Sequence, residues 1–212
     1  MVSGLYAGKI FQVYAPSKRK DWADFLKAFS VWTSLGLENL SSDGFTLKGS
    51  ASLRDDKYLS SFSSQSDVEP SFSEILPSSV KNCVCVAVSS PKSYFDDHSV
   101  YYSASYGKVN IPTESLERSG VKEVAYAVFP SGEMDRRITL MKTDKDLNIK
   151  GIVKNTHTDE LRVLFGDLFA SDADSLMSSI KGGWTVFGDS PSLNAFLSRP
   201  SSGGTLKERL SS

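Results

Sequence analysis

The strongest constraint on the fold is a pair of apolar segments, VKEVAYAVFP at 121–130 and RRITLMKT at 136–143, separated by the polar stretch SGEMD. Both segments are rich in β-branched and aromatic residues, which favour strands. A connection of five residues suits a hairpin and is much too short for the crossover that parallel strands need. The sequence therefore predicts an antiparallel hairpin in the middle of the chain.

Further strands are predicted on both sides of this hairpin, at 8–16, 44–54, 81–90 and 184–189, and LNIKGIVKN at 147–155 is expected to add a third strand to it. Residues 44–54 alternate apolar and polar side chains, which is typical of a strand with one buried face. The segment at 81–90 is apolar on both sides, as in a strand that is covered on both faces.

Amphipathic helices are predicted between the strands. The clearest spans residues 18–36, where Trp22, Phe25, Leu26 and Phe29 follow the i, i+3, i+4, i+7 spacing of one helical face. A capping pattern, Thr156-x-x-Asp159, favours a second amphipathic helix from there to residue 169. The other predicted helices or helical turns are 57–62, 71–76, a helix from Pro91, 113–120, 172–183, a helix from Pro191, and the tail at 203–212.

These elements mix without strict strand–helix alternation, which predicts an α+β fold with a mostly antiparallel sheet covered by helices. A length of 212 residues suits a single domain spanning 1–212. An apolar strand runs into Ser-Pro and a helix twice, at 83–91 and at 184–191. This repetition indicates a faint internal duplication or only the common preference of helix starts for Ser-Pro, and both interpretations stay open.

Charge and hydropathy narrow the functional classes. The chain has 24 basic and 25 acidic residues, well mixed, so no basic face for a nucleic acid is expected. No apolar stretch reaches the roughly 20 residues that span a bilayer. The N-terminus lacks the pattern of a signal peptide, so contact with a membrane is expected only through a segment outside this sequence.

The two cysteines, Cys83 and Cys85, lie two residues apart on one predicted strand. Their parallel Cβ vectors disfavour a disulfide, and the chain offers no second cysteine pair for a metal. We expect both to be core residues, and we expect no metal and no cofactor.

His98 and His157 are the only histidines, and each has carboxylates nearby in sequence: Asp96 and Asp97 for the first, Asp159 and Glu160 for the second. A serine nucleophile needs a base that a carboxylate orients, so a hydrolase using either histidine is one hypothesis. Solvated surface positions are the simpler explanation. No Gly-x-Ser-x-Gly motif supports the hydrolase.

Tyr94, Tyr101, Tyr102 and Tyr106 crowd into one predicted helix. Exposed on one side, these rings would form a contact surface for a protein or a glycan. Buried, they would be an ordinary packing stripe.

Four stretches carry a resemblance: LKAFSVWTSLGLENLSSDGFTLKGSASL, YLSSFSSQ with ILPSSVKNCVCVAVSSPKSYF, LRVLFGDLF, and WTVFGDSPSLNAFL. Together they resemble the N-terminal domain of an uncharacterised family of Bacteroidetes cell-envelope proteins. In that family a membrane-targeting segment typically precedes this region and a β-rich, propeller-like region follows it. The resemblance implies a location outside the cytoplasm, periplasmic or on the surface, and a chain that is part of a longer exported protein. It implies no catalytic residues.

The sequence therefore favours a non-catalytic envelope module that binds or scaffolds through a protein or glycan partner. A hydrolase and a purely structural spacer are the alternatives.

Overall fold

The structure is a computed structural model that describes residues 30–40, 45–107, 114–145, 147, 149–166, 168–170, 175–180, 182–199 and 204–211. The chain divides into two compact units, residues 1–64 with 96–109 and residues 65–95 with 110–212, which are described separately below. The single domain expected for residues 1–212 stays a prediction.

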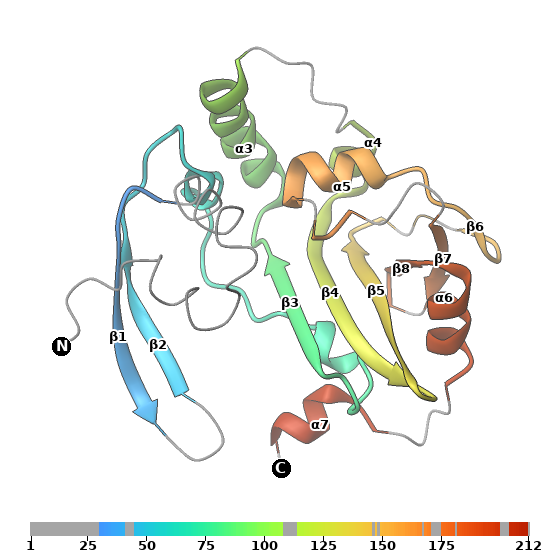
Figure 1. Ribbon diagram of the computed structural model, residues 1–212. Coiled ribbons are helices and arrows are strands. Elements are labelled where there is room, and N and C mark those ends of the chain that lie inside the picture. The colour runs from blue at the N-terminus through green and yellow to red at the C-terminus, as the bar shows by residue number, and fades with distance from the viewer. Residues whose placement is uncertain are drawn as a thin grey trace. The chain divides into compact units, whose positions relative to one another are not determined.

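The second unit is built on an antiparallel sheet with the strand order β3-β4-β5-β8-β7-β6 (Figure 1). The predicted hairpin is confirmed as β4–β5, with Val124 opposite Met141 and Ala127 opposite Ile138. Because every described strand pair is antiparallel and helices accompany the sheet, the predicted α+β class is confirmed. The strands are β3 (Asn82–Ala87), β4 (Val121–Ser131), β5 (Met134–Thr143), β6 (Val153–Lys154), β7 (Leu176–Ile180) and β8 (Trp184–Gly188).

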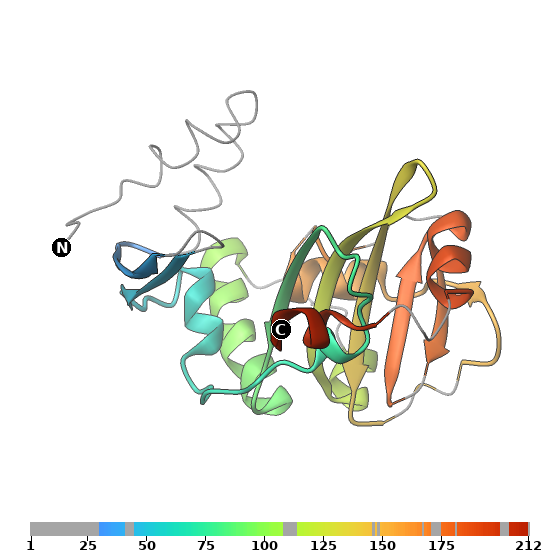
Figure 2. The same ribbon diagram turned by 90° about the horizontal axis from the view of Figure 1, so that it is seen from below.

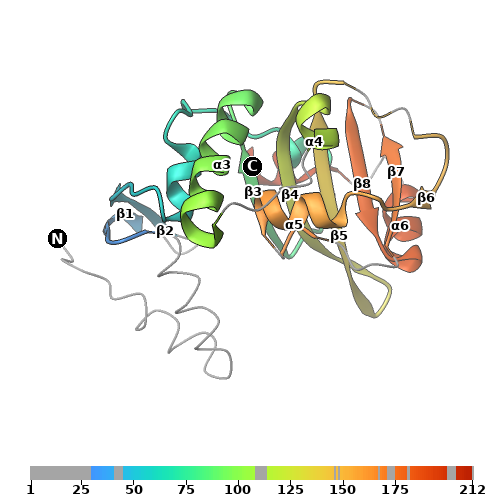
Figure 3. The ribbon, with the colours of Figure 1, turned by 90° about the horizontal axis from the view of Figure 1, so that it is seen from above.

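Helices accompany the sheet. Helix α6 packs against β5, β8 and β7, and α7 packs against the short 3₁₀ helix η3 (Figure 2). Figure 3 shows α4 and α5 beside β4 and β5. Helix α3 begins in the second unit and continues in the first. The bounds are η3 (Phe72–Glu74), α3 (Pro91–Tyr106), α4 (Glu114–Ser119), α5 (Thr158–Phe165), α6 (Ser190–Leu197) and α7 (Leu206–Ser211).

The main core lies on one face of this sheet. Successive side chains of a strand point to opposite faces, so alternate residues of β4, β5 and β8 gather on the side of α6 and α7. The opposite face is also buried, at Val124, Met141 and Phe187 among others. The core cluster comprises Leu76, Val80, Ala125, Ala127, Phe129, Ile138, Leu140, Trp184, Val186, Leu193, Phe196 and Leu206.

Two of the three predicted helix starts carry a side-chain cap. The Asp189 carboxylate accepts a hydrogen bond from the Ser192 N–H at 2.7 Å at the start of α6. The Ser90 hydroxyl accepts one from the Ser93 N–H at 3.3 Å at the start of α3. At α5 the capping prediction was wrong: the helix begins at Thr158, and the residue before it makes no side-chain cap.

Two predictions in the second unit need correction. Residues 172–183 were predicted as a helix, but Leu176–Ile180 form strand β7. The segment has an ambiguous apolar pattern, and pairing with β8 across a turn that contains Gly182 and Gly183 overrides its helical propensity. The strand expected within 147–155 exists as β6, but it pairs with β7 instead of extending the β4–β5 hairpin.

The first unit contains an antiparallel hairpin, β1 (Thr33–Leu40) with β2 (Phe45–Ala51), followed by the 3₁₀ helix η2 (Tyr58–Phe62). The strand predicted within 44–54 is confirmed. The helix predicted for 18–36 was wrong at its end, because Thr33–Gly36 belong to β1, where pairing with β2 outweighs the local helical spacing. Its remainder, residues 18–29, and the strand predicted at 8–16 lie outside the described residues.

The suspected duplication takes a different form from the one the sequence suggested. The two Ser-Pro segments follow β3 and β8, which occupy different positions in the sheet. What repeats is the order strand, helix, hairpin: β3-α3-β4-β5, interrupted by the short α4, and then β6-α5-β7-β8. Across the sheet, the strands of the first set appear in chain order, β3-β4-β5, and those of the second set in reverse chain order, β8-β7-β6. The two sets meet where β5 pairs with β8.

Candidate functional site

A hydrogen-bonded serine–histidine pair lies in the first unit. Nδ1 of His98, on α3, lies 3.1 Å from Oγ of Ser61, on η2, which is hydrogen-bonding distance. Aromatic rings of Tyr58, Tyr101 and Tyr102 lie 5.5 to 6.3 Å from the imidazole, centroid to centroid. The pair therefore sits in an aromatic enclosure that residues 37 positions apart in sequence build together.

A serine next to an imidazole is the first half of a hydrolase site. A substrate could not reach this pair, because both side chains are buried. Ser61 is 0% exposed and His98 is 1% exposed. The neighbouring carboxylate of Asp97 turns elsewhere: it accepts hydrogen bonds from Ser63 Oγ, Ser64 N–H and Ser64 Oγ. In this arrangement His98 connects α3 to η2, and Asp97 connects it to the residues directly after η2.

His157 lies in the second unit, directly before α5. Its Nδ1 is 3.2 Å from Oε1 of Glu160, and both side chains are 13% exposed. The other oxygen of Glu160 accepts a hydrogen bond from the Leu116 N–H of α4 at 2.9 Å. Asp159, the second carboxylate expected near this histidine, instead forms an exposed ion pair with Arg162 at 2.7 Å. The local geometry therefore connects α5 to the start of α4 through Glu160.

The tyrosines predicted as a contact surface are largely inside the protein. Tyr94 is 0% exposed, donates a hydrogen bond to the Leu164 carbonyl at 2.5 Å and stacks on Phe165. Tyr101 is buried against Tyr58, with ring centroids 5.7 Å apart. These two rings therefore pack in the interior, which was the alternative to a contact surface.

Two tyrosines remain for the predicted surface. Tyr102 is partly exposed, and the side chain of Tyr106 lies outside the described part. The seven-residue spacing of Tyr94 and Tyr101 was the signal of a buried helical stripe.

Both cysteines are free thiols on β3, half-buried on the side of the main core. Burial raises the pKa of both thiols, most strongly for Cys85, whose Sγ lies 3.7 Å from a carboxylate oxygen of Glu123. Within the described residues no group of three His, Cys, Asp or Glu side chains has the arrangement of a metal site. The prediction that both faces of β3 are covered was wrong, because Val84, on the face away from the two cysteines, is 48% exposed.

Sequence reasoning missed Glu123 of β4, a buried carboxylate with several hydrogen bonds. It is 5% exposed, and its oxygens accept hydrogen bonds from the Ser71 N–H, the Ser71 hydroxyl and the Phe72 N–H at 2.6 to 3.0 Å. Lys142 Nζ donates to the same Ser71 hydroxyl at 2.7 Å and lies over the Trp184 ring. The available signal was the single acidic residue of a mostly apolar strand.

Comparison of the chain with protein-family models, with curated protein sequences and with solved structures gave no match. Among the described helices, none combines the length and the apolar character that crossing a membrane requires. The fold and the site geometry are therefore the basis for a functional proposal.

Proposed function

We propose that this protein is a non-catalytic binding or scaffolding module. The observation that carries the proposal is the complete burial of the Ser61–His98 pair. A hydrolytic serine has to reach the substrate carbonyl, and its base has to receive the serine proton in that complex. A nucleophile without solvent contact, enclosed by tyrosine rings, supports a structural role for the hydrogen bond.

A hydrolase that uses His157 is the second candidate. One observation favours it: the contact with Glu160 is the kind of carboxylate–imidazole pairing that orients a catalytic base. The same carboxylate also accepts a backbone N–H from α4, which supports a structural role equally well.

The location and the partner follow from the sequence resemblance. It supports the cell envelope, outside the cytoplasm, and a protein or glycan partner. Balanced charge makes a nucleic-acid partner a poor fit. Membrane attachment would depend on a segment beyond this sequence.

A serine-directed fluorophosphonate tests the proposal, because it forms a phosphorus–oxygen bond only with an activated, accessible serine and releases fluoride. We expect no adduct in the intact mass of the native protein. An adduct at Ser61 that is lost in His98→Asn would refute the proposal.

Ester hydrolysis tests the second candidate. Catalysed turnover that is abolished in His157→Gln, and retained in the exposed control Asp159→Asn, would establish it; equal background rates in all three proteins are expected. Binding to a glycan array then separates a glycan partner from a protein partner.

A further inference from the structure

The C-terminal part of the second unit closes back on the segment that leads into the sheet. Residues 204–211, which include α7, lie against residues 72–80, which run from η3 to the approach of β3 (Figure 2). Thr205 and Pro77 form an isolated antiparallel bridge. Residues from the beginning and the end of this unit are therefore held together directly.

Two main-chain hydrogen bonds flank this bridge. The Leu206 N–H donates to the Leu76 carbonyl at 2.9 Å, and the Ser78 N–H donates to the Gly204 carbonyl at 3.1 Å. Together they form an antiparallel ladder that is a single bridge long. Each bond has one partner in either segment, so both bonds break when the two segments separate.

Side chains of α7 add polar contacts to the same segment. The Arg209 guanidinium donates to the carbonyls of Ser78 and Val80. The Lys207 ammonium lies 2.8 Å from a carboxylate oxygen of Glu74, and both of these side chains are more than half exposed. Exposed ion pairs contribute little to stability, so this pair adds little to the attachment of α7.

A single leucine anchors this segment in the core. Leu206 is 2% exposed and belongs to the core cluster together with Leu76 and Val80. The residues that follow it, 207–211, are all exposed, and Leu210 is 70% exposed. Because the burial of apolar surface is the main favourable term in packing, the attachment of α7 depends chiefly on Leu206.

The thiol of Cys83, on β3, belongs to the same surroundings. Cys83 packs against the core cluster that contains Leu206. Burial raises the pKa of this thiol, and the positive charge of Arg209 opposes the effect in part, so the guanidinium is close enough to act on the thiol. Separation of α7 from the sheet would take Leu206 out of the cluster and Arg209 away from the thiol.

Opening of this segment disturbs far less of the core than unfolding of the sheet does. It breaks the contacts between residues 204–211 and 72–80 and transfers one buried leucine to water. The pairing of β4 with β5 and of β5 with β8 involves none of these residues. Segments with few buried apolar contacts open at lower free energies than core strands.

We propose that residues 204–211 form a clasp that opens and closes as one unit while β4, β5, β7 and β8 stay folded. In the closed state the clasp holds the segment that leads into β3 and shields Cys83. In the open state residues 76–80 lose their hydrogen-bond partners in the clasp, and the Cys83 thiol becomes accessible. The clasp is a conformational device that links the position of the C-terminal segment to the reactivity of a thiol on β3.

Residue-resolved hydrogen exchange of the wild-type chain tests whether the clasp opens separately. The amides of Leu206 and Ser78 are bonded across the clasp, so we expect them to share one protection factor. This factor should be at least about tenfold lower than that of the core amides of β4 and β5. Equal protection of the clasp and of the core strands would overturn the proposal, because the clasp would then open only with the whole unit.

Labelling with N-ethylmaleimide, located by mass spectrometry, tests the link to Cys83. Leu206→Asp should speed the labelling of Cys83 at least about tenfold, because the open state gains what the closed state loses in buried apolar contact. Leu210→Asp, the same change at an exposed position of α7, should leave the rate unchanged. Unchanged labelling in Leu206→Asp would overturn the link, and protection of the β4 and β5 amides that falls to the level of the clasp would overturn its separate opening.

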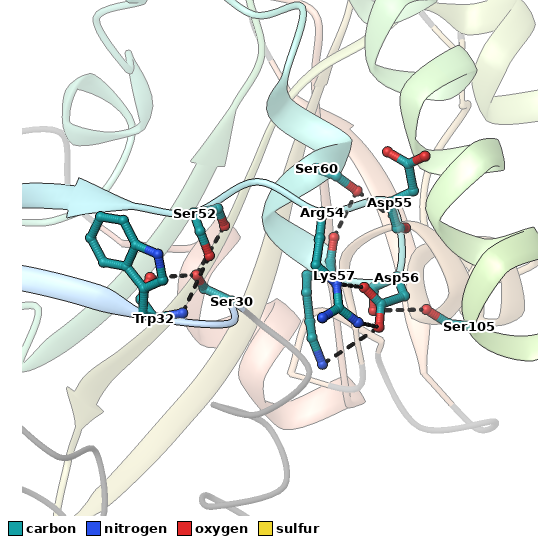
Figure 4. A network of polar contacts seen from close by, with 9 residues as sticks. All are labelled: Ser30, Trp32, Ser52, Arg54, Asp55, Asp56, Lys57, Ser60 and Ser105. Carbon is teal, nitrogen blue, oxygen red and sulfur yellow. Dashed lines mark hydrogen bonds and ion pairs between the residues drawn. The ribbon is translucent and has the colours of Figure 1, made fainter.

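A second pair of variants removes an arginine contact. Arg209→Ala should speed exchange of the Leu206 amide at least about threefold, because the guanidinium bonds to two carbonyls are lost. The control is Arg54→Ala in the first unit, where Arg54 forms a two-pronged contact with Asp56 at 2.6 and 2.8 Å (Figure 4). This control should leave the exchange of Leu206 unchanged. Equal rates in the two variants would overturn the assignment of Arg209 to the clasp.

Discussion

Replacing Glu123 with glutamine tests whether the buried carboxylate is a main anchor between β4 and the segment that leads into the sheet. Its Oε2 accepts the Ser71 N–H and hydroxyl, and its Oε1 accepts the Phe72 N–H and the Cys85 thiol. A glutamine has the same shape but only one acceptor oxygen. In either orientation of the amide, its NH₂ group points at one of the two backbone N–H groups, which cannot reverse their role.

The magnitude follows from that count. At least one backbone hydrogen bond to a charged acceptor is lost, which costs about 1.5–3 kcal/mol. The second backbone bond weakens because its acceptor is now neutral. We therefore expect Glu123→Gln to lower the free energy of unfolding by about 2–3 kcal/mol, which is a fall in Tm of roughly 4–12 °C for a chain of this length.

Urea denaturation followed by circular dichroism measures the change. The control is Glu133→Gln, at an exposed position in the β4–β5 turn, which should stay within about 0.5 kcal/mol of the wild type. If Glu123→Gln behaves like this control, the hydrogen bonds of Glu123 do not stabilise the fold and the argument fails.

Two further predictions concern the ends of strand β8. Gly183 has φ +77°, and a Cβ there would lie 3.1 Å from a backbone carbonyl of β5, whereas Gly132 has φ +62° and open space around it. Urea titrations should show that Gly183→Ala lowers the free energy of unfolding by about 2 kcal/mol or more and Gly132→Ala by about 1 kcal/mol. Equal losses in the two variants would contradict the contact at Gly183. Hydrogen bonding from Ser192 lowers the pKa of Asp189, so this cap stabilises the fold above the unfolded-state pKa and loses its effect as pH falls through the lower folded-state pKa. Asp189→Ala should therefore cost about 1 kcal/mol at pH 7, and its difference from the wild type in thermal melts should shrink below about pH 4; a difference that does not change with pH would contradict this assignment.

Local sequence signals identified most of the elements. The β4–β5 hairpin was predictable because two apolar strands flank a short polar turn, and no other pairing satisfies both over so short a connection. The starts of α3 and α6 were predictable because the caps, Ser90 and Asp189, act through contacts within a few residues and proline favours the first helical turn.

The candidate site was predictable only as a set of residue types. His98 was an obvious candidate, but its partner Ser61 is one serine among many and lies 37 residues away. Tyr94 and Tyr101 were candidates for a surface, and only the packing of α3 decided that they are buried. Glu123 was not predicted as a candidate, because its hydrogen-bond partners come from the distant segment at 71–72.

The sequence by itself determined the elements whose cause is local: the apolar periods, the turns and the helix caps, which act over a few residues. Only the tertiary structure decided that residues 176–180 are a strand, that β6 joins β7, and that β5 meets β8. These outcomes depend on pairing between segments far apart in the chain, where the free energy of burying a strand in a sheet exceeds the small differences in local propensity.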